Sequence, residues 1–292
     1  LRFIIFSGGM AVMNNDRNNK LVKYLLPVAV IIVLFFFKPL LGILGIIAYI
    51  FYVLFTARSG VYKLIGSVRY SKGDMDNALT WLKKAYESNK ADPRTAISYA
   101  YLLLKAGRLE ESEKVFSELL SGKLNSDDRN LAKSNYALLL WKKGNLDEAI
   151  NMLEEVTKEY KTTTVYGSLG YLLILKGDLD RALEFNLEAY DYNSSNTIIQ
   201  DNLGYTYYLK GEFDKAEEIY KKLVASNPTF PEAYYNYGLV LIKKGDPAKA
   251  YEFMEKSLNY KLTFLSTITR YEIEAKIEEL KTQINKTQQQ ES

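Results

Sequence analysis

Two residue types that suit peptide recognition recur along this chain, asparagine and large aromatic residues. Asparagine stands nine residues before a repeated glycine three times, at Asn135, Asn202 and Asn236. An amide side chain offers both a donor and an acceptor to a peptide group. Aromatic side chains nearby offer large contact areas at small entropic cost. They are Tyr101, Trp141, Tyr171, Tyr205, Tyr208 and Tyr235. Together these residue types suit contacts with peptide groups and with apolar side chains.

The sequence lacks the residues that most enzymes use for catalysis. It contains no cysteine and no histidine. Thiol nucleophiles, disulfides, Cys/His zinc sites and the histidine base of a serine triad are therefore excluded here. No phosphate-binding glycine loop is present, and the acidic residues fall on helix faces, where solvation explains them. We expect no catalytic residue, no metal and no cofactor; an enzyme with an unrecognised carboxylate site is kept as an alternative.

The net charge of +3 is unevenly distributed. The first 58 residues carry +5, so the rest of the chain carries −2. Nucleic-acid binding needs a basic stripe or face, which this nearly neutral remainder does not provide. We therefore expect no nucleic-acid partner.

A repeated glycine sets the positions of the asparagines and aromatics. It recurs at spacings of 34, 37, 33, 34 and 34 residues, at Gly73, Gly107, Gly144, Gly177, Gly211 and Gly245. Very small residues stand seven before and five after each glycine, as close packing of two helices requires. Lysine commonly precedes the glycine and an acid often follows, which suits the dipoles of a helix end and a helix start. A fixed period of this size predicts a stack of helix pairs.

The pattern resembles the tetratricopeptide repeat (TPR) family, most clearly over Leu169–Tyr190 and Leu203–Pro228. The resemblance implies an all-α, right-handed α-solenoid of about six helix pairs over residues 59–264. Three additional residues between the second and third units are expected in a loop over Gly122–Asp128. We place the units at about 59–92, 93–126, 130–163, 163–196, 197–230 and 231–264.

The resemblance also implies where a partner would bind. In this family the first helix of each pair lines a concave groove, so the three asparagines and six aromatics become candidate contacts with a protein or peptide partner. The lysine–asparagine clamp of chaperone-binding members is not present as a set, because Ser67 stands where its asparagine should be.

Two apolar stretches precede the repeats. Tyr24–Phe37 and Leu40–Thr56 carry no charge, and Lys38-Pro39 divides them. We expect a transmembrane helical hairpin over residues 21–57, with helices at 21–37 and 40–56. Each helix would be about 26 Å long, slightly less than a bilayer core of roughly 30 Å. Alternatives are a single span and a signal peptide on Tyr24–Phe37, although no small-x-small cleavage site follows that stretch.

Basic residues flank the apolar stretches on both sides. Arg17, Lys20 and Lys23 precede them, and Arg58 and Lys63 follow. Basic flanks prefer the cytoplasm, so the repeats are expected on the cytoplasmic side of a bacterial-type inner membrane. Residues 1–20 are expected to be disordered or to lie upstream of the true start, which we place at Met13.

A helix with a heptad-like seam follows the repeats. Ile273, Ile277, Leu280 and Ile284 are spaced by four, three and four residues. A helix over 265–287 that caps the last apolar face of the stack is expected, with a disordered tail over 288–292. A short coiled-coil dimer is the alternative, so the oligomeric state stays open.

These features together predict a membrane-anchored scaffold or adaptor that binds an extended peptide or a partner protein. Tethering at a membrane raises the local concentration of a bound partner, which suffices without catalysis. A regulator of cell-envelope assembly or of membrane-protein turnover is the alternative. The sequence does not identify the partner.

Overall fold

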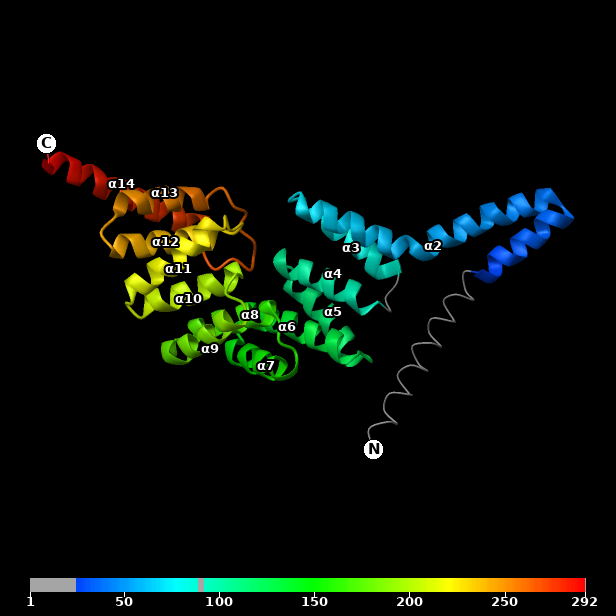
Figure 1. The fold of residues 1–292 in the computed structure, drawn as a ribbon, viewed down its shortest axis with the longest axis horizontal. Coiled ribbons are helices and arrows are strands. Elements are labelled where there is room, and N and C mark those ends of the chain that lie inside the picture. Colours follow the sequence, from blue (N-terminus) through cyan, green and yellow to red (C-terminus); the bar gives the residue numbers. More distant parts are fainter. Residues whose placement is uncertain (1–24, 89–91, 292) are drawn as a thin grey trace, which may run out of the picture. The chain divides into compact units, whose positions relative to one another are not determined.

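The computed structural model describes residues 25–88 and 92–291, and within these residues all regular structure is helical (Figure 1). The chain divides into two compact units, Leu1–Asn89 and Lys90–Ser292. The expectation for residues 1–20 and the beginning of the first predicted span lie outside the described residues. The predicted all-α fold is confirmed over the described parts.

The first unit contains two apolar helices that pack tightly against each other. The first helix spans Leu25–Phe37, and after Lys38 helix α2 begins at Pro39. A Cβ atom added to Gly42 would lie 2.5 Å from the Phe35 ring, and one added to Gly45 would lie 3.1 Å from Ile31. The later residue of α2, Gly45, contacts the earlier residue of the first helix, Ile31, so the two helices are antiparallel. The turn at Lys38-Pro39 is therefore that of a helical hairpin.

Helix α2 (Pro39–Ser71) is longer than the sequence indicated. A span ending at residue 56 and a separate repeat helix starting at residue 59 were expected, but α2 runs through both for 33 residues. The beginning of α2 is apolar, with a mean hydropathy of 2.4 over its most apolar window. The end of α2 packs on α3 (Met75–Ser88): Ser59 Oγ donates to the Ala85 carbonyl at 3.0 Å, and Gly66 lies against Leu82. One helix thus belongs to both the apolar hairpin and the first repeat.

Five helix pairs build most of the second unit. The first helices of consecutive pairs contact one another in series, which gives the unit one continuous face of first helices. The pairs are α4 (Pro93–Lys105) with α5 (Leu109–Ser121), α6 (Ser126–Lys142) with α7 (Leu146–Glu159), α8 (Thr163–Lys176) with α9 (Leu179–Tyr192), α10 (Thr197–Leu209) with α11 (Phe213–Ala225), and α12 (Pro231–Lys243) with α13 (Pro247–Ser257).

The repeated glycines end the first helices, as predicted. All six have positive φ angles, between 76° and 90°, a conformation that glycine adopts without a Cβ penalty. The flanking lysines and acids also pair between neighbouring units. Equivalent ion pairs join Lys176 to Asp147, Lys210 to Asp180 and Lys244 to Asp214. These pairs are on the surface, where each one contributes little to stability.

Very small residues lie where the helices of a pair cross, which confirms the predicted packing. Ala137 and Ala149 are fully buried in one pair, and Ser112 Oγ donates to the Ala100 carbonyl at 2.8 Å in another. A Cβ atom on Gly204 would lie 2.8 Å from the Tyr220 ring. The helices therefore approach too closely there for a larger residue.

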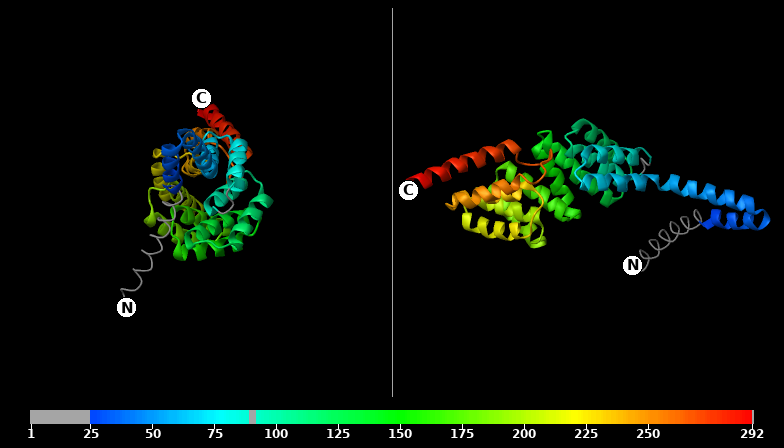
Figure 2. Two further views of the ribbon diagram at one scale, coloured as in Figure 1. Left: turned by 90° about the vertical axis from the view of Figure 1, so that its right-hand side faces the viewer. Right: turned by 90° about the horizontal axis from the view of Figure 1, so that it is seen from above.

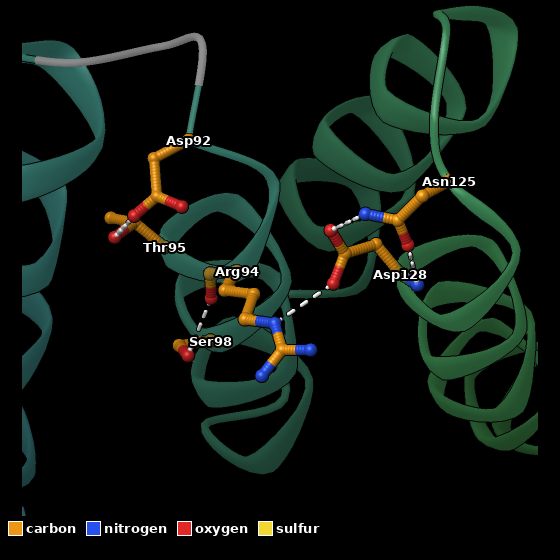
Figure 3. Close-up of polar contacts among 6 residues, drawn as sticks. All are labelled: Asp92, Arg94, Thr95, Ser98, Asn125 and Asp128. Atoms are coloured by element: carbon orange, nitrogen blue, oxygen red, sulfur yellow. Dashed lines mark hydrogen bonds and ion pairs between the residues drawn. The ribbon is translucent and has the colours of Figure 1, made fainter. Parts of the chain in front are cut away.

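The unit predicted at about 130–163 begins earlier in the structure, with α6. The loop expected over Gly122–Asp128 ends at Asn125, whose side chain caps α6 by accepting from the Asp128 amide at 2.8 Å (Figure 3). The three additional residues therefore lengthen α6 and do not form a loop. Asp128, which is buried, also accepts from Arg94 Nε of α4 at 2.9 Å. This ion pair raises the pKa of the Arg94 guanidinium.

The last helix, α14, spans Arg270–Glu291 and packs on α13 (Figure 2). It starts five residues after the predicted position, and it continues through residues 288–291, where we expected disorder. Its start is fixed by a reciprocal cap, because the Glu272 carboxylate accepts from the Thr269 amide at 2.6 Å and Thr269 Oγ1 accepts from the Glu272 amide at 3.2 Å. Ile273, Ile277 and Leu280 are buried in the apolar cluster of the last pairs, as a capping helix requires.

Candidate functional site

A cavity of about 320 Å³ lies on the face of the first helices. This volume is within the usual range for ligand sites, and every pair of the second unit contributes to its wall. Its lining combines aromatic, hydroxyl, amide and acidic side chains. The residues used below are Tyr101, Leu138, Trp141, Tyr171, Asp201, Asn202, Glu232, Leu265 and Thr267.

Three of the six predicted aromatics meet at this cavity. Tyr101 comes from α4, Trp141 from α6 and Tyr171 from α8. The Trp141 and Tyr171 rings pack edge to face, with centroids 5.6 Å apart. Burial raises the pKa of the Tyr171 hydroxyl, so it stays protonated and can donate a hydrogen bond. Ammonium Nζ of Lys142 lies 4.1 Å from the Trp141 ring centroid, at one end of this aromatic wall.

The other three predicted aromatics lie further along the same face. Tyr205 and Tyr208 stack with ring centroids 6.0 Å apart. Tyr208 and Tyr235 pack against the apolar cluster to which α14 contributes Ile273. Burial raises the pKa of all three phenols. The structure therefore separates the predicted aromatics into three that line the cavity and three that lie beside it or under the capping helix.

The predicted asparagines are mostly buried, and each amide nitrogen donates to an acceptor in the chain itself. Asn135 Nδ2 donates to the Leu131 carbonyl of its own helix at 3.0 Å. Asn202 Nδ2 donates to the Gly167 carbonyl at 2.7 Å, which ties α10 to α8. Asn236 Nδ2 donates to Asp201 Oδ1 at 3.1 Å, which ties α12 to α10. Of the three, only Asn202 lines the cavity, and the amides of Asn202 and Asn236 tie neighbouring helices together.

Two acidic residues of the cavity were not among the predicted site residues. Asp201 Oδ1 accepts from Tyr220 Oη at 2.9 Å, and burial raises the pKa of the Asp201 carboxyl to about 7. Glu232 Oε1 accepts from the Thr267 amide at 3.0 Å. Among the described residues, no three acidic side chains come together as a metal site would need. The Asp201 carboxyl therefore accepts a hydrogen bond between two helices, whereas Glu232 accepts one from the segment that follows α13.

A second hollow, of about 510 Å³, lies between α7 and α9. Charged side chains dominate its lining, and some of them pair with each other, as Arg181 does with Glu154 and Lys161 with Glu188. Solvated ion pairs offer little apolar area to a ligand. The aromatic cavity on the first helices is therefore the better candidate site.

Models of the TPR repeat match three parts of the chain. A model described as tetratricopeptide repeat matches residues 136–196, a second matches 60–92 and 231–263, and one described as TPR repeat matches 204–245. Together these residues make up more than half of the chain. A search of curated proteins found no match.

Solved structures share the fold at low sequence identity. A tetratricopeptide repeat protein from Parabacteroides merdae has a TM-score of 0.62 at 13% identity, over 88% of this chain and 98% of that one. PilF of Pseudomonas aeruginosa has a TM-score of 0.56 at 14% identity, over 78% and 99%. PilW, a type IV pilus biogenesis factor, has a TM-score of 0.56 at 15% identity, over 68% and 91%. The matched repeats and the shared fold show that this chain belongs to the tetratricopeptide repeat family.

Proposed function

We propose that this protein is a membrane-anchored scaffold that binds an extended segment of a partner protein in the groove of its first helices. The observation that carries the proposal is the cavity walled by Tyr101, Trp141 and Tyr171. Aromatic walls bind apolar side chains, while Glu232 supplies an acceptor for a peptide amide. PilF and PilW support the fold alone, because their identity to this chain is low.

The groove is tested by cross-linking in the cell. A photo-reactive amino acid at Leu138, which lines the cavity, is expected to give a discrete adduct with a partner. The same residue at Glu118, which is exposed on α5, is the matched control and is expected to give none. Indistinguishable adducts at the two positions would contradict the groove.

Trp141→Ala is expected to lower the affinity for the partner at least about tenfold and to lower the yield of the Leu138 adduct accordingly. A buried aromatic anchor commonly carries more than about 1.4 kcal/mol of binding energy. Trp141→Phe keeps most of the ring and is expected to keep most of the adduct. Asn202 and Asn236 are less suitable targets, since replacing either would also release a helix from its neighbour. An adduct that survives Trp141→Ala would place the partner elsewhere.

The anchor is proposed to be the hairpin of helix Leu25–Phe37 and the apolar part of α2. Many of its large apolar side chains are exposed, such as Leu44 at 54% and Phe51 at 68%. Water disfavours such a surface, whereas a bilayer accepts it. The Arg58 guanidinium lies 3.4 Å from the Phe55 ring centroid, which suits a residue at the edge of a bilayer.

Leu44→Arg/Phe51→Arg is expected to release most of the protein from the carbonate-resistant membrane fraction, because each arginine costs about 2.5–3.5 kcal/mol at a helix centre. Leu44→Met/Phe51→Met is the control and is expected to stay in the membrane. Equal extraction of both variants would contradict the anchor.

The basic flanks support a cytoplasmic repeat domain, so a reporter active only in the periplasm should be inactive when fused after Ser292.

A further inference from the structure

The segment between α13 and α14, residues 258–269, leaves its own helix pair and reaches distant first helices. It follows Ser257 of α13 and is the orange loop in Figure 1. The Phe264 amide donates to the Lys105 carbonyl of α4 at 3.2 Å. Lys142 Nζ of α6 donates to the Ser266 carbonyl at 3.5 Å. The segment therefore touches the opposite end of the stack from the pair that it leaves.

Joining α13 to α14 does not require this course. The two helices pack directly on each other, and helices in such contact are usually joined by 2–8 residues. Segment 258–269 is longer, and its additional residues run along the face of the first helices. A detour of this length that ends in specific contacts indicates a role beyond connection.

The segment reaches the groove as a tight turn, in which the Ser266 amide donates to the Thr263 carbonyl at 2.9 Å. Its main-chain groups bond to the groove walls, as the Thr267 amide does with the Glu232 carboxylate at 3.0 Å. Leu265 and Thr267 line the same cavity as the predicted aromatics Tyr101, Trp141 and Tyr171. The Phe264 ring lies against Gly107, and Lys142 Nζ is 5.3 Å from its centroid.

This occupation is weak enough to be reversed. Phe264 is 42% exposed, and the bond from Lys142 to the Ser266 carbonyl is long. A typical hydrogen bond adds only about 1 kcal/mol net, so a few of them hold the segment without locking it. Leu262 and Ile268 of the segment pack in the same apolar cluster as Ile273 of α14, so residues 263–267 between them can leave the groove while α14 stays in place.

We propose that segment 258–269 is a built-in ligand that occupies the groove and competes with the partner. This inference rests on the proposed function and also defines the partner chemistry: an aromatic residue, an aliphatic residue, a small residue and a hydroxyl residue presented on a turn, as in Phe264–Thr267. A segment that fills the groove about nine-tenths of the time weakens the apparent affinity for the partner about tenfold.

The test uses the full chain in detergent and a fluorescein-labelled synthetic peptide with the sequence of residues 261–269. In an opened variant, glycine and serine replace Thr263–Thr267 at equal length. We expect this variant to bind the peptide about tenfold more tightly than the native chain does. A single cooperative melting transition would show that the cap is intact.

A locked variant tests the same inference in the other direction. Because the native chain has no cysteine, Lys105→Cys/Phe264→Cys can form one disulfide only, between positions whose main chains are hydrogen-bonded. We expect the oxidised form to bind no peptide and the reduced form of the same sample to bind it. The reduced form is thus its own control for the two substitutions.

Two results would overturn the inference. Equal affinity of the native, opened and locked chains would show that the segment does not compete, and it would leave the proposed function standing. Absence of binding to the opened variant would show that the segment is no ligand of the groove. The proposed function is judged separately, by the cross-link at Leu138, which does not use this peptide.

Discussion

Gly170→Ala is expected to lower the free energy of unfolding by about 3 kcal/mol, because it overpacks the core and disturbs the hydrogen bonds of a buried amide. The added Cβ would lie 2.0 Å from Asn186 Oδ1, on a side chain that is fully buried. Asn186 cannot move freely, because its Nδ2 donates to the Gly170 carbonyl at 3.3 Å and to Thr206 Oγ1 at 3.1 Å. The expected readout is a fall in melting temperature of about 10 °C for the full chain in detergent.

Gly238→Ala is the matched control, because its new Cβ would meet Met254 at 2.7 Å. A methionine side chain is flexible and can adapt, and alanine favours a helix over glycine by about 1 kcal/mol. We therefore expect a change within about 1 kcal/mol. Asn186→Ala should rescue Gly170→Ala in a double-mutant cycle, because it removes the clashing group. If Gly170→Ala and Gly238→Ala lower the melting temperature equally, or if Asn186→Ala does not restore the stability of Gly170→Ala, the helices at Gly170 leave room for a Cβ atom.

The helix pairs could be predicted from the sequence because their signals are local and repeated. A glycine that ends a helix in the left-handed conformation needs only its own backbone, and all six glycines have it. Small residues at a fixed distance from each glycine mark the crossings for the same reason. The register then placed Tyr101, Trp141 and Tyr171 on one face, where the structure brings them to one cavity.

Features that depend on distant contacts could not be predicted. Composition changes at Thr56, but nothing there breaks a helix, so α2 continues through the boundary that hydropathy indicated. Segment 258–269 has no periodic pattern, and its course depends on Lys105 and Glu232, far away in sequence. One local signal was available: Thr269 and Glu272 have the spacing of a capping box, which marks the start of α14.

The burial of Asp201 also depends on other helices, and it gives the second large expected effect. Burial raises the pKa of this carboxyl to about 7, compared with 3.8 for the ordinary group. Between pH 4 and 7 the folded chain therefore holds a proton that the unfolded chain has lost. The stability contributed by Asp201 is fully present below about pH 4, falls as the pH rises to about 7, and changes little above that value.

Asp201→Asn removes this titration and keeps an oxygen that can accept from Tyr220 and Asn236. At pH 8 we expect the variant to be more stable than the native chain, by on the order of 2–4 kcal/mol. At pH 4 the two chains should have similar melting temperatures, because Asp201 is protonated when folded. The measurement is the difference between their melting temperatures from pH 4 to pH 8.

Asp180→Asn makes the same charge change on the surface and is the control. The Asp180 side chain is 91% exposed, and its ion pair with Lys210 lowers its pKa, so its contribution to stability is lost as the pH falls and not as it rises. The two variants should therefore differ from the native chain with opposite signs at neutral pH. If the Asp201→Asn and native melting curves keep a constant separation from pH 4 to pH 8, the carboxyl is not held protonated, and Tyr220 and Asn236 stabilise the charged form instead.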